Sequence, residues 1–246
     1  MTDLIKTDLR AGVLHIELNR PGAKHALTTE MYGALVRIFA GARDDEAVRV
    51  VLFKGGHGCF CAGNDIGDFL EQPVLSEGSP VLEFLHELAN FDKPLIAAVA
   101  GPAIGVATTF LLHCDLVYAT ESAVFSLPFV NLGISPEAAS TYLLPRQLGY
   151  PRAAELLLLG ERFSAGRALE LGLINAVVGE ETYWEHATTQ AEKLAAKPAA
   201  AVRATKRLMR GDGATLHEVI DREARQFVQL RDSEEARAIF RQFLKR

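Results

Sequence analysis

The chain has 246 residues, of which 49% are hydrophobic and 23% charged, as expected of a globular protein with a sizeable core. Its formal net charge of −5 argues against broad nucleic-acid binding, because no positive field would attract phosphates. Cys59 and Cys61 are too close for an ordinary disulfide and leave Cys114 unpaired, a pattern that suits a reducing compartment. The first residues show no signal-peptide core and the apolar window 95–112 is broken by glycine and proline. We therefore expect a cytoplasmic protein that does not enter a membrane.

The first part of the chain has the pattern of strands that alternate with helices. Residues 4–18 alternate loosely between apolar and polar around an Ala11–Gly12 turn, which predicts two strands. Thr28 or Thr29 can cap a helix whose apolar residues recur at helical spacing. Residues 48–53 form a short, continuous apolar run, which is typical of a strand covered on both faces.

A glycine-rich loop follows this buried strand and leads to two predicted helices. Residues 65–70 can form a short helix. Residues 71–80 are polar, with two prolines and a glycine, and are the best candidate for a mobile loop. Ser79 followed by Pro80 then indicates the start of another helix, because proline is favoured at the first helical position.

The stretch around Gly101 and Gly105 has the most informative local pattern. An apolar run at residues 95–100 ends at Gly101 and Pro102, and Gly105 then opens a second apolar segment that is typical of a buried helix. A strand that ends in a tight turn and leads into a helix leaves backbone N–H groups free at the helix start. Such donors favour negative charge.

Beyond this stretch the pattern changes from mixed to helical. Residues 123–127 predict another strand, and alternation up to about residue 150 indicates an α/β layer. Ser164 caps a helix that ends at Gly172. Residues 182–246 have a helical pattern almost throughout, with a capping box at Thr215-Leu-His-Glu218. These last helices have no sheet of their own, so we expect them to pack on the first part of the chain or on another subunit.

Two strand-to-helix turns share one physical design. One follows the strand at 48–53 and opens a helix at 63–65, and the other follows the strand at 95–100. If both strands lie in one sheet, two backbone N–H groups could converge on a single oxygen, which is the geometry of an oxyanion hole. The alternative is two ordinary turns, which are common in α/β folds.

Five segments, in order along nearly the whole chain, resemble the crotonase superfamily, also called the enoyl-CoA hydratase/isomerase family. They are NRPGAKHAL (19–27), FCAGNDI (60–66), IAAVAGPAIGVA (96–107), FSLPFVNLGISPEAAS (125–140) and FSAGRALELGLINAVV (163–178). The resemblance implies an α/β fold, with a β-β-α spiral core at residues 1–178 and a helical trimerisation region at residues 179–246. It also implies a coenzyme A thioester as substrate, no separate cofactor, and a homotrimer or dimer of trimers.

The resemblance assigns roles to residues of both loops and to a basic helix. It implies that the N–H groups of Asn64 and Val106 form the oxyanion hole, and that Lys24, Ala62 and Lys206 bind coenzyme A. For Lys206 there is an alternative, since basic residues recur at positions 203, 206, 207 and 210 on one helix face. Such a face can simply be exposed to solvent.

The sequence departs from the hydratases of this family at both of their catalytic glutamates. The corresponding residues are Thr109 and Phe129, neither of which exchanges protons near neutral pH. Water addition by the usual route is therefore not expected. With Leu70 and Leu132, these two residues are expected to line the acyl pocket.

Glu137 resembles the catalytic glutamate of the peroxisomal type of Δ3,Δ2-enoyl-CoA isomerase. A single carboxylate can remove a proton from C2 and deliver one to C4, and burial raises the pKa of such a base. From position alone, Glu137 could instead be an ordinary acidic residue in the first turn of a helix after Pro136.

The sequence thus predicts an isomerase of 3-enoyl-CoA thioesters, with Glu137 as acid and base. The alternatives are a hydratase or another crotonase-type enzyme with a nonstandard base, and an acyl-CoA-binding protein without turnover. No metal site is expected, because His57, Cys59 and Cys61 lack the usual ligand spacing. Serine hydrolysis is disfavoured, since the chain has no G-x-S-x-G motif.

Overall fold

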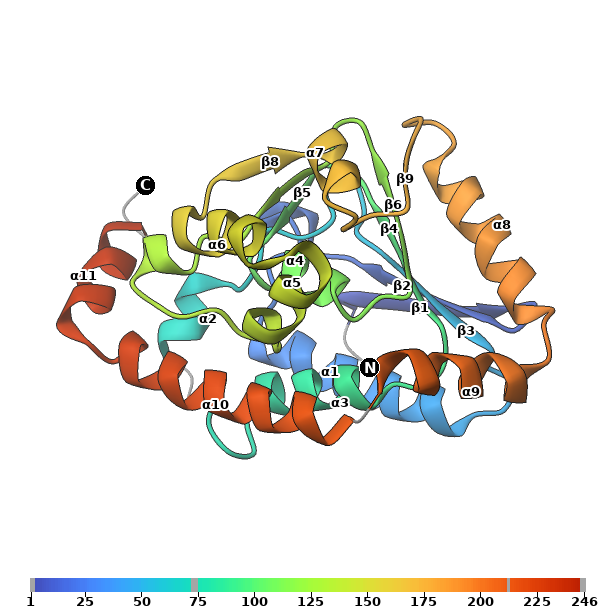
Figure 1. Ribbon diagram of the computed structural model, residues 1–246, viewed down its shortest axis with the longest axis horizontal. Helices are drawn as coiled ribbons and strands as arrows, with labels where there is room; N and C mark the ends of the chain where they lie inside the picture. The colour runs from blue at the N-terminus through green and yellow to red at the C-terminus, as the bar shows by residue number, and fades with distance from the viewer. Residues whose placement is uncertain (1–2, 72–74, 212, 244–246) are drawn as a thin grey trace.

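A six-stranded sheet lies at the centre of the computed structural model, which describes residues 3–71, 75–211 and 213–243 (Figure 1). Its strand order is β1-β2-β3-β4-β6-β9. The strands are β1 (Ile5–Arg10), β2 (Val13–Leu18), β3 (Val50–Lys54), β4 (Leu95–Val99), β6 (Leu116–Thr120) and β9 (Ala176–Val178). Only β1 pairs antiparallel, and the others run parallel. The strands predicted around the Ala11–Gly12 turn and from the two apolar runs are confirmed.

A smaller three-stranded sheet, in the order β5-β7-β8, lies above the ends of β3 and β4 (Figure 1). Its strands are β5 (Pro102–Ile104), β7 (Val124–Ser126) and β8 (Arg162–Ser164). The sequence indicated only a turn at β5. The structure makes it an edge strand, because residues 102–104 pair in register with residues 124–126. A proline that opens an edge strand loses no ladder hydrogen bond.

The helices begin largely where the predicted caps stand. They are α1 (Thr29–Asp44), α2 (Ile66–Glu71), α3 (Pro80–Asn90), α4 (Val106–Leu111), α5 (Ser140–Leu148), α6 (Tyr150–Leu159), α7 (Ala165–Glu170), α8 (Tyr183–Ala195), α9 (Ala199–Arg210), α10 (Gly213–Arg231) and α11 (Glu234–Phe243), with 3-10 turns η1 (Pro21–Ala23) and η2 (Val130–Leu132). Thr28, Ser79 and Ser164 each accept a hydrogen bond from the N–H three residues later. Of the loop predicted at 71–80, residues 72–74 lie outside the described residues.

The predicted capping box in the C-terminal region is wrong. Helix α10 already includes Gly213, so Thr215 and Glu218 lie inside the helix and do not mark its start. The predicted apolar positions of this helix are nevertheless buried, among them Val219, Ile220 and Phe227. The apolar spacing thus predicted the buried face of the helix, whereas the cap motif did not predict where the helix begins.

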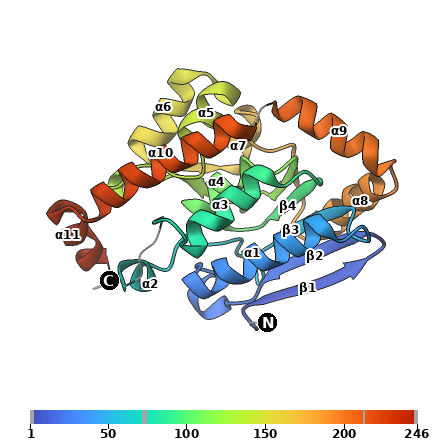
Figure 2. The same ribbon diagram turned by 90° about the horizontal axis from the view of Figure 1, so that it is seen from below.

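The C-terminal helices cover the first part of the chain. Ala187, Ala191 and Ala195 on α8 pack against one face of the six-stranded sheet, where Val50 and Leu52 are fully buried (Figure 1). Three alanines at spacings of four give this helix a smooth face that can approach the sheet closely. Helices α1 and α3 cover the other face, and α10 runs alongside α3 (Figure 2).

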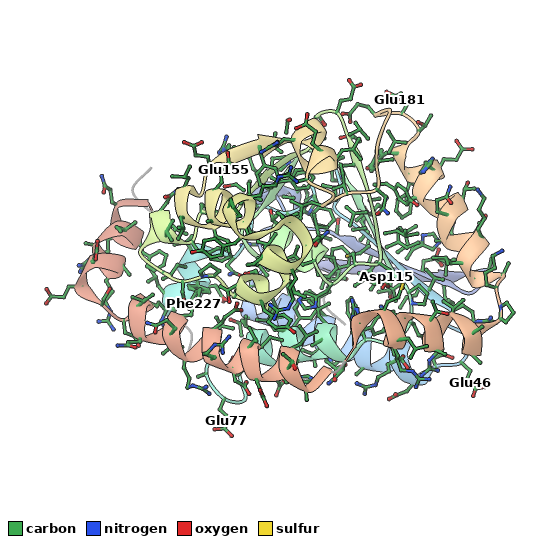
Figure 3. All side chains as sticks on the ribbon, in the orientation of Figure 1. Glu46, Glu77, Asp115, Glu155, Glu181 and Phe227 are labelled. Carbon is green, nitrogen blue, oxygen red and sulfur yellow. The ribbon has the colours of Figure 1, made fainter. Side chains whose placement is uncertain are left out.

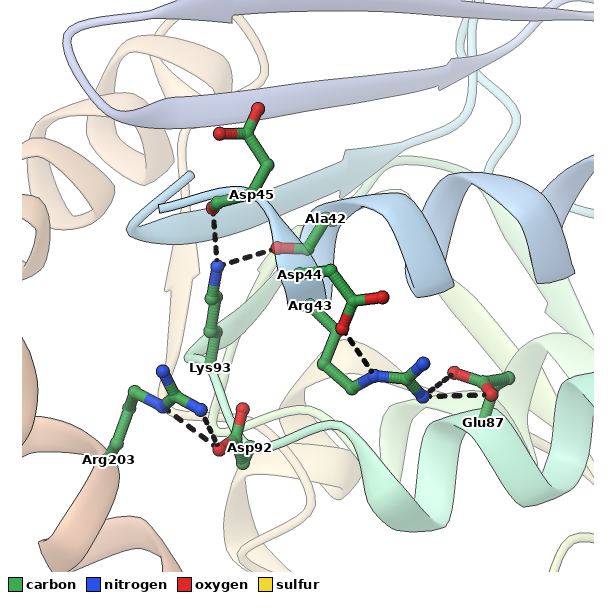
Figure 4. Close-up of polar contacts among 8 residues, drawn as sticks. All are labelled: Ala42, Arg43, Asp44, Asp45, Glu87, Asp92, Lys93 and Arg203. Carbon is green, nitrogen blue, oxygen red and sulfur yellow. Dashed lines mark hydrogen bonds and ion pairs between the residues drawn. The ribbon is translucent and has the colours of Figure 1, made fainter. Parts of the chain in front are cut away.

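Polar contacts attach α9 to the rest of the molecule (Figure 4). Arg203 of α9 donates to the carboxylate of Asp92. Lys93, which follows Asp92 in the chain, donates to the carbonyl oxygens of Ala42 and Asp45 at 2.7 Å each. These carbonyls stand at the C-terminal end of α1, where a positive charge is favoured by the helix dipole.

Aromatic packing connects α10 to the short helix α2. Phe227 points into the molecule, whereas Glu77 and Glu181 project outward (Figure 3). The ring centroids of Phe227 and Phe69 lie 5.4 Å apart in an edge-to-face arrangement. Among the helices of the described residues, none is long and apolar enough to cross a membrane.

Candidate active site

A cleft of about 1090 Å³ lies between the three-stranded sheet, the loop that leads into α2 and the C-terminal helix α11. Its lining comes from residues within 24–26, 62–69, 102–106, 124–134, 160–162 and 239–242. Both glycine-rich turns predicted from the sequence are therefore at this cleft. The two turns are far apart in sequence and contribute to one site.

The two turns are joined by backbone hydrogen bonds. The N–H of Cys61 donates to the carbonyl of Pro102 at 2.9 Å, and the N–H of Ile104 donates to the carbonyl of Cys61 at 3.0 Å. Gly63 has φ of +98°, and a Cβ at this position would lie 2.9 Å from the carbonyl oxygen of Ile104. Only glycine allows this close approach of the two segments.

Just beyond this contact, each turn presents a backbone donor to the cleft. Asn64 and Val106 both line it, and their N–H groups have no acceptor among residues 3–71, 75–211 and 213–243. The N–H of Asp65, by contrast, donates to Leu27. Val106 is the first residue of α4, where an N–H is left free by the helix geometry. Two free donors at one cleft are what an oxyanion hole needs.

Glu137 is buried and its carboxylate has no protein partner. The residue is 1% exposed, and neither carboxylate oxygen has a hydrogen-bond partner within the described part of the chain. Burial, with a smaller contribution from the charge of Glu223, raises the pKa of Glu137 to about 8. Helix α5 begins only at Ser140, so Glu137 is not in the first turn of a helix, and that alternative is wrong.

Glu137 is not itself among the lining residues of the cleft, but its charge acts on Tyr32, which binds one of them. Burial raises the pKa of Tyr32 well above its ordinary value, and the charge of Glu137 adds to this effect. The hydroxyl of Tyr32 donates to the side-chain oxygen of Asn64 at 2.5 Å. Glu137 is therefore close to the wall that carries one of the two free donors, and Ile134 of its own segment lines the cleft.

Two of the three residues expected to bind coenzyme A are at the cleft. Lys24 and Ala62 line it and are joined by a hydrogen bond of 2.9 Å from the N–H of Ala62 to the carbonyl of Lys24. Lys206 is elsewhere, 3% exposed, with its ammonium 2.7 Å from the carboxylate of Asp115 and 2.6 Å from the carbonyl of Lys93. The expected phosphate contact of Lys206 is not supported, because its charge is already neutralised inside the protein. Nor is Lys206 on a solvated face.

The expected acyl-pocket residues divide in the same way. Phe129 and Leu132 line the cleft, whereas Leu70 and Thr109 do not. The side chain of Thr109 is fully buried, and its hydroxyl donates to the carbonyl of Val106 at 3.2 Å, one turn back in α4. On α2, the neighbouring Phe69 is the residue that reaches the cleft.

Other residues of the site were missed by the sequence interpretation. Ile239 and Phe240 of α11 line the cleft. The apolar residues of this amphipathic helix could have indicated that one of its faces packs on the protein. Tyr32 lies on the predicted buried face of α1, where nothing in the sequence distinguishes it from a core residue. Within the described residues, no group of three or more His, Cys, Asp or Glu side chains could hold a metal ion.

The chain was compared with protein families, curated proteins and solved structures. Residues 8–246 match the family model described as enoyl-CoA hydratase/isomerase. Enoyl-CoA delta isomerase 2 of Rattus norvegicus is 36% identical over 219 residues, which are 86% of this chain and 56% of the relative. The chain thus spans about half the length of that relative. The 1,2-epoxyphenylacetyl-CoA isomerase of Escherichia coli (strain K12) is 36% identical over 205 residues, 80% of this chain and 78% of that protein. The structure of Pseudomonas aeruginosa OdaA has a TM-score of 0.97 and 44% identity over 100% of both chains.

Proposed function

The chain belongs to the enoyl-CoA hydratase/isomerase family, and from this premise we propose that it moves the double bond of 3-enoyl-CoA thioesters to the 2-position. The predicted crotonase fold with its C-terminal helices is confirmed by the structural matches. The observation that carries the proposal is the buried carboxyl of Glu137, which has a raised pKa and no partner within the residues that the structure describes. A carboxyl in this state is suited to exchange protons with a carbon acid near neutral pH.

The reaction needs one proton carrier and no co-reactant. The Glu137 carboxylate takes a proton from C2, and the electrons of the C2–H bond move into a dienolate with its negative charge on the thioester oxygen. The carboxylic acid so formed returns the proton to C4. The carbonyl reforms, the double bond now lies between C2 and C3, and Glu137 is a carboxylate again. The shuttling of one proton between two carbons fits a single base.

The negative charge on the thioester oxygen is assigned to the free N–H groups of Asn64 and Val106. Such donors act most strongly when they already point at the developing charge in a site without bulk water. Removing one donor of this kind typically costs about 3 kcal/mol in the reaction barrier. Lys24 and Ala62, on the same cleft, are the proposed contacts for the coenzyme A portion.

The nature of Thr109 and Phe129 favours isomerisation over hydration. Addition of water needs an acid/base group that activates the water. Phe129 contributes only a hydrocarbon ring to the cleft, and the hydroxyl of Thr109 is bound to a backbone carbonyl. Among the described lining residues the carboxylate is that of Asp65, and Arg20 already binds it in an ion pair of 2.7 Å.

An assay with two substrates tests the proposal. The absorbance of the conjugated thioester is followed with 3-hexenoyl-CoA and with 2-hexenoyl-CoA. We expect the absorbance to rise with the first substrate and to stay constant with the second. A fall with 2-hexenoyl-CoA would instead establish hydration and contradict the proposal.

The Glu137→Gln variant then tests the base. It is expected to lose isomerisation while calorimetry shows that it still binds acyl-CoA. Glu121→Gln removes an equal charge from an exposed position and is the matched control. An unchanged rate in Glu137→Gln would exclude Glu137 as the base, and loss of acyl-CoA binding would show a structural role.

A further inference from the structure

The two residues after Glu137 have an unfavourable backbone conformation. Ala138 and Ala139 have φ of 61° and 56°, in the left-handed region. For a residue with a Cβ this conformation costs about 1–2 kcal/mol. Neither alanine has a side chain that could form a compensating hydrogen bond. The turn that carries the proposed base must therefore be held by other parts of the protein.

Glu223, on α10, supplies much of this support. One carboxylate oxygen accepts the N–H of Ala139 at 2.7 Å. The other accepts the N–H of Thr141 at 2.9 Å and its hydroxyl at 2.5 Å. Glu223 is 5% exposed, so these three charge-assisted hydrogen bonds are largely shielded from water.

These contacts replace the missing cap of α5. Its N-cap residue, Ala139, has no side-chain hydrogen bond to the helix. The carboxylate of Glu223 occupies the capping position instead, although it comes from 84 residues further along the chain. The positive end of the α5 dipole favours this negative charge.

The carbonyl groups of the turn are also bound. The carbonyl of Glu137 accepts the N–H and the hydroxyl of Ser140, at 3.1 Å and 2.6 Å. His113 lies 2.8 Å from the carbonyl of Ala138 through Nε2. Burial and the charge of Arg210 lower the pKa of His113 to about 4, so the neutral ring donates from Nε2. The carbonyls of Glu137 and Ala138 are thus held, whereas neither carboxylate oxygen of Glu137 has a partner in the described part of the chain.

Glu223 also affects Glu137 through its charge. Burial raises the pKa of Glu223 to about 7, against the opposing effects of its three hydrogen bonds and of Arg222. Because these donors favour its carboxylate, Glu223 ionises before Glu137, and its charge then opposes the ionisation of Glu137. Tyr32 and His113 are also near Glu137, and both stay neutral near neutral pH because burial raises the pKa of Tyr32 and lowers that of His113.

We propose that Glu223 is a positioning residue for the reaction: it fixes the 138–141 turn that aims the Glu137 carboxylate and keeps a second negative charge near it. This inference rests on the proposed function for its kinetic consequences. Its structural basis is the set of three hydrogen bonds from Glu223, which does not depend on the substrate.

Glu223→Gln tests the proposal, with Glu218→Gln as matched control. Glu218 is exposed on the same helix, so both variants lose one negative charge from α10. Glutamine has one accepting oxygen where Glu223 has two. In Glu223→Gln the N–H of Ala139 or of Thr141 therefore faces an NH2 group, which cannot accept a hydrogen bond, and the turn loosens. We expect kcat to fall on the order of tenfold to a hundredfold with KM little changed, since a small displacement of a catalytic group has this effect. We expect no change in Glu218→Gln.

The pH profile separates positioning from a merely structural role. Loss of the Glu223 charge should move the acid limb of the kcat/KM profile toward lower pH, since Glu137 then ionises more easily. A structural defect would lower kcat/KM at every pH and leave the midpoint of the acid limb at the same pH as in Glu218→Gln. That result would overturn the proposal.

A direct titration distinguishes failure of this proposal from failure of the proposed function. Infrared or 13C NMR spectroscopy of the Glu137 carboxyl, in the protein without substrate, should show a lower pKa in Glu223→Gln than in the wild type. If the wild type has no isomerase activity but this shift occurs, only the function is wrong. If Glu223→Gln does not fold, Thr141→Val decides, because it removes only the hydroxyl that donates to the Glu223 carboxylate at 2.5 Å and is expected to lower kcat with KM little changed. An unchanged kcat in folded Thr141→Val would overturn the proposal.

Discussion

The hydroxyl of Tyr32 donates a hydrogen bond of 2.5 Å to the side-chain oxygen of Asn64. Tyr32 is on α1 and is fully buried, whereas the backbone of Asn64 carries one of the two free donors at the cleft. The contact therefore holds the turn of Asn64 from α1. A tyrosine that is buried like a core residue thus supports the proposed site.

Tyr32→Phe should therefore slow isomerisation without unfolding the protein. A single hydrogen bond of this kind contributes about 1 kcal/mol net, so we expect kcat to fall by no more than about tenfold. Steady-state kinetics with 3-hexenoyl-CoA measures this change. Tyr118→Phe, on the other side of the sheet beside α8, is the control. Equal rates in the wild type and Tyr32→Phe would show that Asn64 needs no such support.

The rate of isomerisation should rise with pH up to about 8. The base must be ionised to take a proton, and burial raises the pKa of Glu137 to about 8. Below that value kcat/KM should fall, approaching about tenfold per pH unit. Since Glu223 titrates nearby, with a pKa of about 7, the profile will report the pair. A flat profile between about pH 6 and about pH 9 would contradict a buried carboxylate base.

The same carboxyl should make the folded protein less stable at alkaline pH. The folded state keeps a proton on Glu137 that the unfolded chain releases above its ordinary pKa of 4.5. The penalty therefore grows as pH rises from about 4.5 to about 8 and is complete above that. Glu137→Gln should melt at a higher temperature than the wild type at about pH 9, with a smaller difference at about pH 5. Differential scanning calorimetry at both pH values tests this, and a difference that does not depend on pH would count against it.

Lys206 and Lys24 should have opposite phenotypes. Lys206→Met leaves Asp115 without its buried cation and should lower the free energy of unfolding by about 3 kcal/mol, with the KM for acyl-CoA unchanged. Lys24→Ala removes an exposed cleft residue and should raise KM without affecting stability. Urea unfolding and steady-state kinetics of both variants measure these effects. A raised KM in folded Lys206→Met would instead support the predicted contact between Lys206 and coenzyme A.

Sedimentation should show an oligomer, with a trimer as the expected unit. Leu208 and Met209 on α9 are 84% and 74% exposed, which is unusual for two adjacent large apolar residues. Replacing both with serine should shift the species toward the 26.8 kDa monomer, whereas Leu9→Ser, on β1, should not. A wild-type monomer at micromolar concentration would show that the prediction is wrong.

The sequence predicted those features that depend on neighbours along the chain. Thr28, Ser79 and Ser164 cap their helices because a cap acts over three residues. The continuous apolar runs became β3 and β4 because a strand covered on both faces needs no alternation. The glycine turns could be located for the same reason, since their conformation is local.

Features that depend on distant partners could not be predicted. Lys206 had the spacing of an exposed basic face, but Asp115 and Lys93 bind its ammonium inside the protein. Thr215 and Glu218 matched a cap motif, but the helix begins before them. Glu223 had no signal at all, because its partners are more than 80 residues away.

The support of the 138–141 turn by α10 and the place of α11 in the cleft wall have a consequence for the newly synthesised chain. Glu223 holds the turn of Glu137, and Ile239 and Phe240 close the cleft wall. The ribosome releases these residues after both sheets have emerged. The nascent protein can therefore complete its sheets early, but we expect it to process no thioester until α10 and α11 have left the exit tunnel.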